Sequence, residues 1–126
     1  MPRDYLLYLE DIQQALDKIQ RYTQGFTQET LADDELRVDG IVRNFEIIGE
    51  AVKNLPADLR ARHPSVPWNQ IAGLRDLLIH QYFSVNMTIL WDIIEHEVPL
   101  LQSAIRAMLE TERDEENQPQ DSTQAP

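Results

Sequence analysis

The stretch 75–82 brings together side chains whose chemistries complement one another. Arg75 is a permanent cation, His80 is an imidazole that titrates near neutral pH, and Tyr82 carries a phenol. A guanidinium can neutralise the charge on a phosphate, and an imidazole can transfer protons as a general base or acid. The pattern Arg, four residues, His, one residue, Tyr therefore suits the cleavage of a phosphodiester. Taken alone, an Arg and a His in a helical protein are more often a surface charge and a partly buried polar group.

The spacing of apolar residues predicts an all-α protein, an antiparallel bundle of four long helices with short extra helical turns. The four helices are expected to cover about residues 4–22, 34–55, 67–82 and 86–108. Thr27 is placed to cap a short turn before the second long helix, and residues 56–63 can hold another short helix. Asn86 is the expected N-cap of the fourth helix, in which Pro99 predicts a kink.

The predicted third helix carries the Arg-His-Tyr motif at its C-terminal end. On an ideal helix, residues five apart are separated by about 140° around the axis, so Arg75 and His80 would not project side by side. Asp76 and His80 are four apart and could hydrogen-bond, so Asp76 could orient the imidazole. Tyr82 would share a face with Arg75, two turns away. One helix therefore makes a poor site, and two copies packed antiparallel could complete it.

Apolar residues on two faces of the third and fourth helices also favour a homodimer. Leu77, Ile79 and Phe83 lie away from the main apolar stripe of the third helix, and Ile89 and Ile93 lie beside that of the fourth. A deeply buried central helix is the alternative explanation.

Length and composition limit the class of protein. A chain of 126 residues with 42% hydrophobic residues predicts one domain with one core. The chain contains no Cys, and residues 1–4 do not resemble the start of a signal peptide, which favours the cytoplasm. No stretch is apolar for long enough to span a bilayer. The net charge of −11 argues against a general nucleic-acid-binding protein, and we expect neither DNA nor a membrane as a partner.

The acidic charge is concentrated towards the C-terminus. Residues 110–126 hold six acidic side chains and Arg113 as their base, and they are rich in Gln and Pro. We therefore expect a helical domain over residues 1–109 and a disordered acidic tail over residues 110–126.

Several segments, in order along the chain, resemble the HepT-like toxins, which are small all-helical ribonucleases of the HEPN superfamily. They are the motif itself, residues 3–12 (RDYLLYLEDI), residues 41–51 (IVRNFEIIGEA), residues 63–68 (HPSVPW), and Tyr82-Phe83 followed by Trp91. Asp76 departs from the family pattern, which often has Asn there. An acid beside the phosphate could tune or weaken the activity.

The resemblance implies a metal-independent RNA endonuclease with a composite cleft at a dimer interface. Arg75 and His80 would be catalytic, with tRNA or mRNA as substrate and with no metal ion or cofactor. It further implies the toxin of a type VII-like toxin-antitoxin pair, whose partner is a minimal nucleotidyltransferase antitoxin. That antitoxin would transfer AMP to Tyr82 and so block the site. The rival interpretation is a non-catalytic helical module that binds a nucleotidyltransferase.

Two weaker patterns are also present. His96 and Asp92 lie four residues apart, but no second His has ligand spacing, so a metal site is not expected. A local basic patch for RNA could form from Arg43, Lys53, Arg60 and Arg62.

Overall fold

The computed structural model describes residues 4–79 and 84–117, and these residues form an all-α fold. The elements, in chain order, are α1 (Asp4–Thr23), α2 (Gln28–Ala32), α3 (Glu35–Lys53), α4 (Ala57–Arg62), α5 (Trp68–Ala72), α6 (Leu74–Leu78), α7 (Met87–Asp92), a π-helix (Ile93–Glu97) and α8 (Val98–Asn117). None of the helices within the described ranges is long and apolar enough to cross a membrane.

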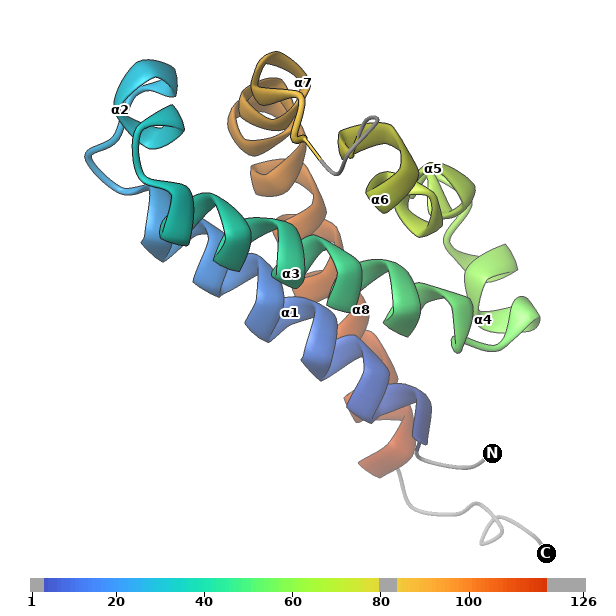
Figure 1. Cartoon of the computed structure of the whole chain (residues 1–126). Helices are drawn as coiled ribbons and strands as arrows, with labels where there is room; N and C mark the ends of the chain where they lie inside the picture. The colour runs from blue at the N-terminus through green and yellow to red at the C-terminus, as the bar shows by residue number, and fades with distance from the viewer. Residues whose placement is uncertain (1–3, 80–83, 118–126) are drawn as a thin grey trace, which may run out of the picture.

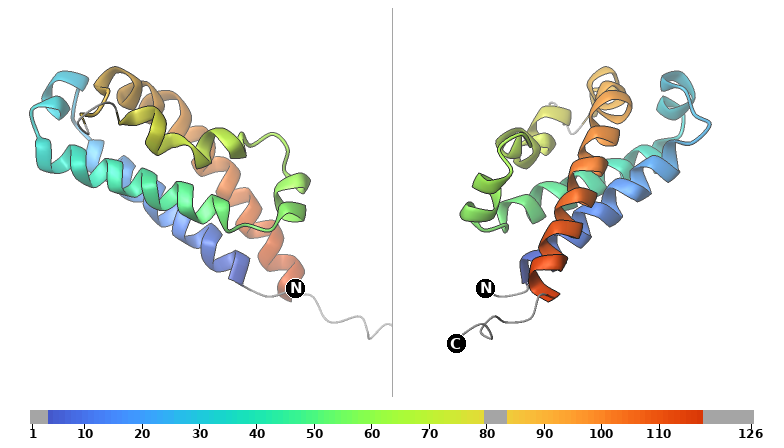
Figure 2. Two further views of the ribbon diagram at one scale, coloured as in Figure 1. Left: turned by 45° about the vertical axis from the view of Figure 1, so that its right-hand side comes forward. Right: turned by 180° about the vertical axis from the view of Figure 1, so that it is seen from behind.

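Three long helices form the frame of the bundle. Figures 1 and 2 show α1 and α3 antiparallel and side by side, with α8 crossing them obliquely and α5 and α6 lying along α3. The apolar stripes of these helices meet in one core, whose fully buried members include Leu9, Ile12, Leu16, Ile19, Ile41, Ile48, Leu78, Leu90 and Ile105. The predicted bundle of helices is confirmed, and burial of these side chains is its main source of stability.

The predicted helix starts are confirmed by their caps. Thr27 forms a capping box with Thr30 at the start of α2, and the Asp34 carboxylate accepts from the Arg37 N–H at the start of α3. That hydrogen bond holds the pKa of Asp34 below its ordinary value. Asn86 Oδ1 accepts from the Ile89 N–H, 3.1 Å away, at the start of α7. Each cap satisfies a backbone N–H that the first turn of a helix leaves unpaired.

The predicted single helix over residues 67–82 is wrong. Gly73 ends α5 and begins α6, and α6 ends at Leu78. Ile79 is extended (φ −106°, ψ 123°) and forms an isolated antiparallel bridge with Val85. The Asn86 N–H also donates to the Leu78 carbonyl, 2.9 Å away. Pairing with the start of α7 therefore stops the helix five residues after Gly73.

A π-helix (Ile93–Glu97) lies just before Pro99, where the sequence predicted a kink. Over residues 93–97 the turn widens, and the Val98 N–H donates to the Ile93 carbonyl five residues earlier. Pro99 lacks an N–H, and its ring clashes with the carbonyl four residues before it, so a regular α-helix is disfavoured at this point. The wide turn lets the consecutive residues Ile93 and Ile94 both be buried. Ile93 is thus used within one chain, contrary to its expected role on a second apolar face.

The expected start of the disordered tail at residue 110 is also wrong. Helix α8 continues to Asn117, and Glu112 within it is 1% exposed. The Glu112 carboxylate accepts from Arg62 Nη2 at 3.2 and 3.3 Å and lies 3.6 Å from His63 Nε2. A buried acid that is paired with a cation fixes this part of the chain to α4. Residues 118–126, the rest of the expected tail, lie outside the described residues.

Candidate functional site

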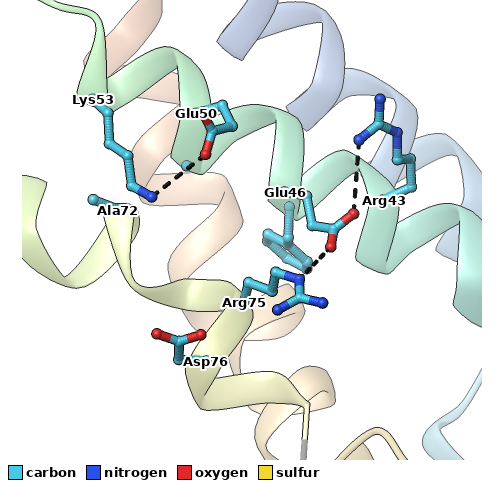
Figure 3. A pocket seen from close by; sticks show the side chains of 9 residues that line it. Arg43, Glu46, Glu50, Lys53, Ala72, Arg75 and Asp76 are labelled. Carbon is cyan, nitrogen blue, oxygen red and sulfur yellow. Dashed lines mark hydrogen bonds and ion pairs between the residues drawn. The ribbon is translucent and has the colours of Figure 1, made fainter. Parts of the chain in front are cut away.

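Arg75, the motif arginine, lies beside a cleft between α3 and the α5–α6 pair. The cleft has a volume of about 390 Å³. Its lining residues come from both sides: Arg43, Phe45, Glu46, Gly49, Glu50 and Lys53 from α3, and Ala72, Arg75 and Asp76 from the second side. Figure 3 shows the charged side chains of both sides turned towards this space.

Glu46 holds the Arg75 guanidinium in place. Arg75 Nε donates to Glu46 Oε2 at 2.6 Å, while Arg43 Nη1 lies 3.7 Å from Glu46 Oε1 (Figure 3). The Glu46 side chain is 27% exposed, whereas those of Arg75 and Arg43 are 51% and 70% exposed. One half-buried carboxylate therefore lies between two cations that water and ligands can reach.

With the remaining charged residues included, the formal charges of the cleft lining balance. Lys53 Nζ lies 3.4 Å from Glu50 Oε2, and Asp76 adds a further carboxylate beside Arg75. Three cations therefore face three acids, in a chain whose formal charge is −11. Against that acidic background the cleft is a place where a phosphate can approach guanidinium groups.

Close packing of two helices sets the width of the cleft. A Cβ placed on Gly49 would lie 3.3 Å from the Ala72 carbonyl oxygen and 3.4 Å from that of Ile71. Helix α5 therefore rests directly on the backbone of α3 at this point. Leu74 and Leu78 are buried and anchor α6. Between them, Arg75 and Asp76 are exposed on the face of α6 that borders the cleft.

The structure places two of the four predicted site residues at the cleft. Arg75 and Asp76 line it, whereas His80 and Tyr82 lie outside the described residues. The angular relations expected among the four side chains assumed one helix through residue 82, and that assumption fails because Ile79 is extended. The orienting role of Asp76 and the composite site therefore stay predictions that this geometry does not support.

Glu46 and Glu50 line the cleft, and neither was expected from the sequence to be a site residue. A signal was available, because the polar residues Arg43, Glu46, Glu50 and Lys53 recur at intervals of three, four and three. That spacing places them on one face of a helix. The polar face of α3 is identified as one side of a cleft only by the position of α6 opposite it.

The expected basic patch is divided between two places. Arg43 and Lys53 line the cleft with Arg75, whereas Arg62 pairs with Glu112 and lies 3.6 Å from Asp58. Arg60 is also absent from the residues that line the cleft. The cations available to a bound phosphate at the cleft are therefore those of α3 and α6.

His96 makes a local contact with Asp92. Its Nδ1 lies 3.1 Å from Asp92 Oδ1. Within residues 4–79 and 84–117, no group of three or more His, Cys, Asp or Glu residues could hold a metal ion.

The all-α bundle of the described residues is consistent with the HEPN class of helical proteins. Residues 12–108 match the model of the "Ribonuclease HepT-like" family. The chain therefore belongs to the HepT-like ribonuclease family.

Three relatives illustrate the similarity. A "putative RNase" of Caldanaerobacter subterraneus subsp. tengcongensis is 43% identical over 106 residues, which cover 84% of this chain and 95% of the relative. A "probable ribonuclease HepT" of Thermococcus cleftensis is 39% identical, covering 81% of this chain and 93% of the relative. A "gamma-glutamylcyclotransferase and putative RNase" of Methanocaldococcus jannaschii is 34% identical over 87% of this chain, which spans only 50% of that longer protein. No solved structure matches the chain significantly.

Proposed function

We propose that the protein is a metal-independent endoribonuclease toxin, in which Arg75 and His80 cleave tRNA or mRNA in the cytoplasm. The observation that carries the proposal is the position of Arg75. Its guanidinium is half exposed at an open cleft, is fixed through Nε, and lies beside the further cations Arg43 and Lys53. Membership of a ribonuclease family supports RNA as the substrate.

The chemistry needs only groups of the RNA and of this chain. His80 would act as general base and remove the proton from the RNA 2′-hydroxyl, whose oxygen attacks the adjacent phosphorus. The bond from phosphorus to the 5′-oxygen breaks, and a general acid returns a proton to that leaving oxygen. Arg75 would stabilise the negative charge that grows on the non-bridging phosphate oxygens. The products are a 2′,3′-cyclic phosphate and a free 5′-hydroxyl.

The test is cleavage of tRNA and of mRNA in EDTA by wild type, Arg75→Ala and His80→Ala. Loss of a general acid-base catalyst should lower the rate by about 10² or more. Lys18→Ala, a surface change on α1 and outside the cleft lining, is the matched control and should cut as wild type does. If wild type leaves RNA intact, the protein is instead a non-catalytic helical module that binds its partner.

The proposal includes a homodimer. Leu77, two residues after Arg75 on α6, is 50% exposed, and Leu100 on α8 is 68% exposed. A second copy that covered Leu77 would place its own motif close to this one. The two chains would then share the site, whatever the orientation of His80 relative to Arg75 within one chain.

The proposal also includes control by a nucleotidyltransferase antitoxin that attaches AMP to Tyr82. Each added phosphodiester carries about one negative charge, which would compete with RNA phosphate for the Arg75 guanidinium. The open side of the cleft supports this mode of control, because Arg75 is accessible to such a group.

A further inference from the structure

Among the described residues, Glu46 is a group on another helix that contacts the Arg75 side chain. It lies on α3, 29 residues before Arg75, and the 2.6 Å contact of its Oε2 with Arg75 Nε joins the two sides of the cleft. We propose that Glu46 is the positioning residue for Arg75, and that it sets the guanidinium for RNA cleavage without touching the reacting atoms. This inference rests on the proposed ribonuclease function.

An arginine at this position would be mobile without a partner. Arg75 is half exposed at the surface of a five-residue helix, and its side chain has many rotamers when nothing holds it. Glu46, by contrast, lies in the middle of the 19-residue α3, next to the buried Phe45. A carboxylate on a long, packed helix can therefore restrict the cation on the short one.

Glu46 contacts one particular nitrogen of the Arg75 guanidinium. A guanidinium that binds a phosphate side-on usually does so through two of its nitrogens at once. Glu46 accepts from Nε, the nitrogen at the base of the group, and the two terminal nitrogens lie on the side away from the Glu46 carboxylate (Figure 3). The ion pair therefore sets the direction of the guanidinium and leaves the end-on geometry for a phosphate.

Glu50 differs from Glu46 in the partner of its carboxylate. It lies one turn further along α3 and lines the same cleft, but its carboxylate contacts Lys53 on its own helix and is 71% exposed. The described structure gives Glu50 no hydrogen bond or ion pair across the cleft. Glu50 thus contributes the same charge to the cleft as Glu46 but makes no contact with Arg75 in the described structure.

If Glu46 positions Arg75, its substitution should change kcat and KM differently. Glu46→Ala should lower kcat about tenfold or more, because small displacements of a catalytic group are costly. KM should stay level or fall, since one acid is removed from the RNA-binding surface. Glu46→Gln keeps an oxygen that can accept from Nε, and it should restore kcat to within about threefold of wild type. Glu50→Ala removes the neighbouring acid of the cleft, which does not contact Arg75, and should lower kcat less than Glu46→Ala does. Asp39→Ala removes an exposed acid of α3 outside the cleft lining and, as the control, should leave kcat unchanged.

The same variants should be studied by NMR of the Arg75 Nε–H group. In wild type and Glu50→Ala this proton should exchange slowly with water, and in Glu46→Ala it should exchange as quickly as that of a solvated arginine. The inference is overturned if kcat of Glu46→Ala lies within about twofold of the wild-type value. It is also overturned if Glu46→Ala and Glu50→Ala lower kcat equally. A rise in KM that accounts for the whole loss would overturn it too, since that would mark Glu46 as part of RNA binding.

The two measurements separate this inference from the proposed function. If wild type cuts RNA and Glu46→Ala behaves as wild type, the inference fails alone. If wild type does not cut RNA, the proposed function is wrong, and Glu46 then has no role in cleavage. The exchange rate of the Nε–H would then still report whether Glu46 holds Arg75.

Discussion

Gly49 controls how closely α5 approaches α3, so a single added methyl group there should test the construction of the cleft. In Gly49→Ala the new Cβ would lie 3.3 and 3.4 Å from two backbone carbonyl oxygens of α5. Backbone atoms cannot move aside as a flexible side chain can, so α5 must shift outward by a few tenths of an ångström. Arg75, on the adjoining α6, would move relative to Glu46.

Two opposing effects set the magnitude. Replacing Gly by Ala inside a helix stabilises it by about 1 kcal/mol. Overpacking a tight contact costs about 1–3 kcal/mol. The free energy of unfolding of Gly49→Ala should therefore lie between that of wild type and about 2 kcal/mol below it. The cleavage rate should fall in either case, because the Arg75–Glu46 contact is disturbed.

Gly40 provides a matched control on the same helix. A Cβ there would meet only the Tyr22 ring, with its nearest atom 3.6 Å away, which is an ordinary van der Waals distance. Gly40→Ala should thus raise the free energy of unfolding by about 0.5–1 kcal/mol and leave cleavage unchanged. Urea unfolding and RNA cleavage are to be measured on both variants. Equal stabilisation by both, with full activity, would refute the close contact of α3 with α5.

Three further results are expected. Arg62→Ala leaves the buried Glu112 carboxylate without the Arg62 cation. Because Arg62 itself is 45% exposed, the free energy of unfolding measured in urea should fall by only about 2–3 kcal/mol. The double variant Arg62→Ala, Glu112→Met should recover most of that loss. If two chains share the active site, mixing inactive Arg75→Ala chains with inactive His80→Ala chains should restore cleavage. If cleavage does not recover after the chains have been shown to exchange, each chain holds a complete site. Co-expression with the cognate nucleotidyltransferase should raise the intact mass in AMP-sized steps, and Tyr82→Phe should abolish the rise; neutralisation without a mass change would mean that the partner acts by binding alone.

Features that depend on neighbouring residues were predictable from the sequence. The caps at Thr27 and Asn86 form within one turn, and the distortion before Pro99 follows from one missing N–H and one ring. The apolar stripes of α1 and α3 likewise identified which faces are buried. All of these depend on periodicity or on contacts within four or five positions.

Features that depend on distant residues were not predictable in the same way. A glycine inside a helix costs only about 1 kcal/mol relative to Ala, so Gly73 did not by itself indicate a break. The end of α6 depends on the bridge between Ile79 and Val85. Glu112 was assigned to a disordered tail by composition, but it pairs with Arg62, 50 residues away. The contact of Glu46 with Arg75 likewise joins two helices whose relative placement no local pattern specifies.

The π-helix before α8 has a consequence for the phase of the last helical segment. A π-turn holds one residue more than an α-turn, so it acts as a one-residue insertion inside a continuous helix. Deleting Glu95 would restore the regular repeat, but it would rotate α7 by about 100° relative to α8. Leu90 would leave the core, and Asn86 would lose its position beside the Leu78 carbonyl. The extra residue of the π-helix thus lets one continuous helical segment make two contacts. The apolar side chains of α8 are buried, and α7 still packs against the end of α6.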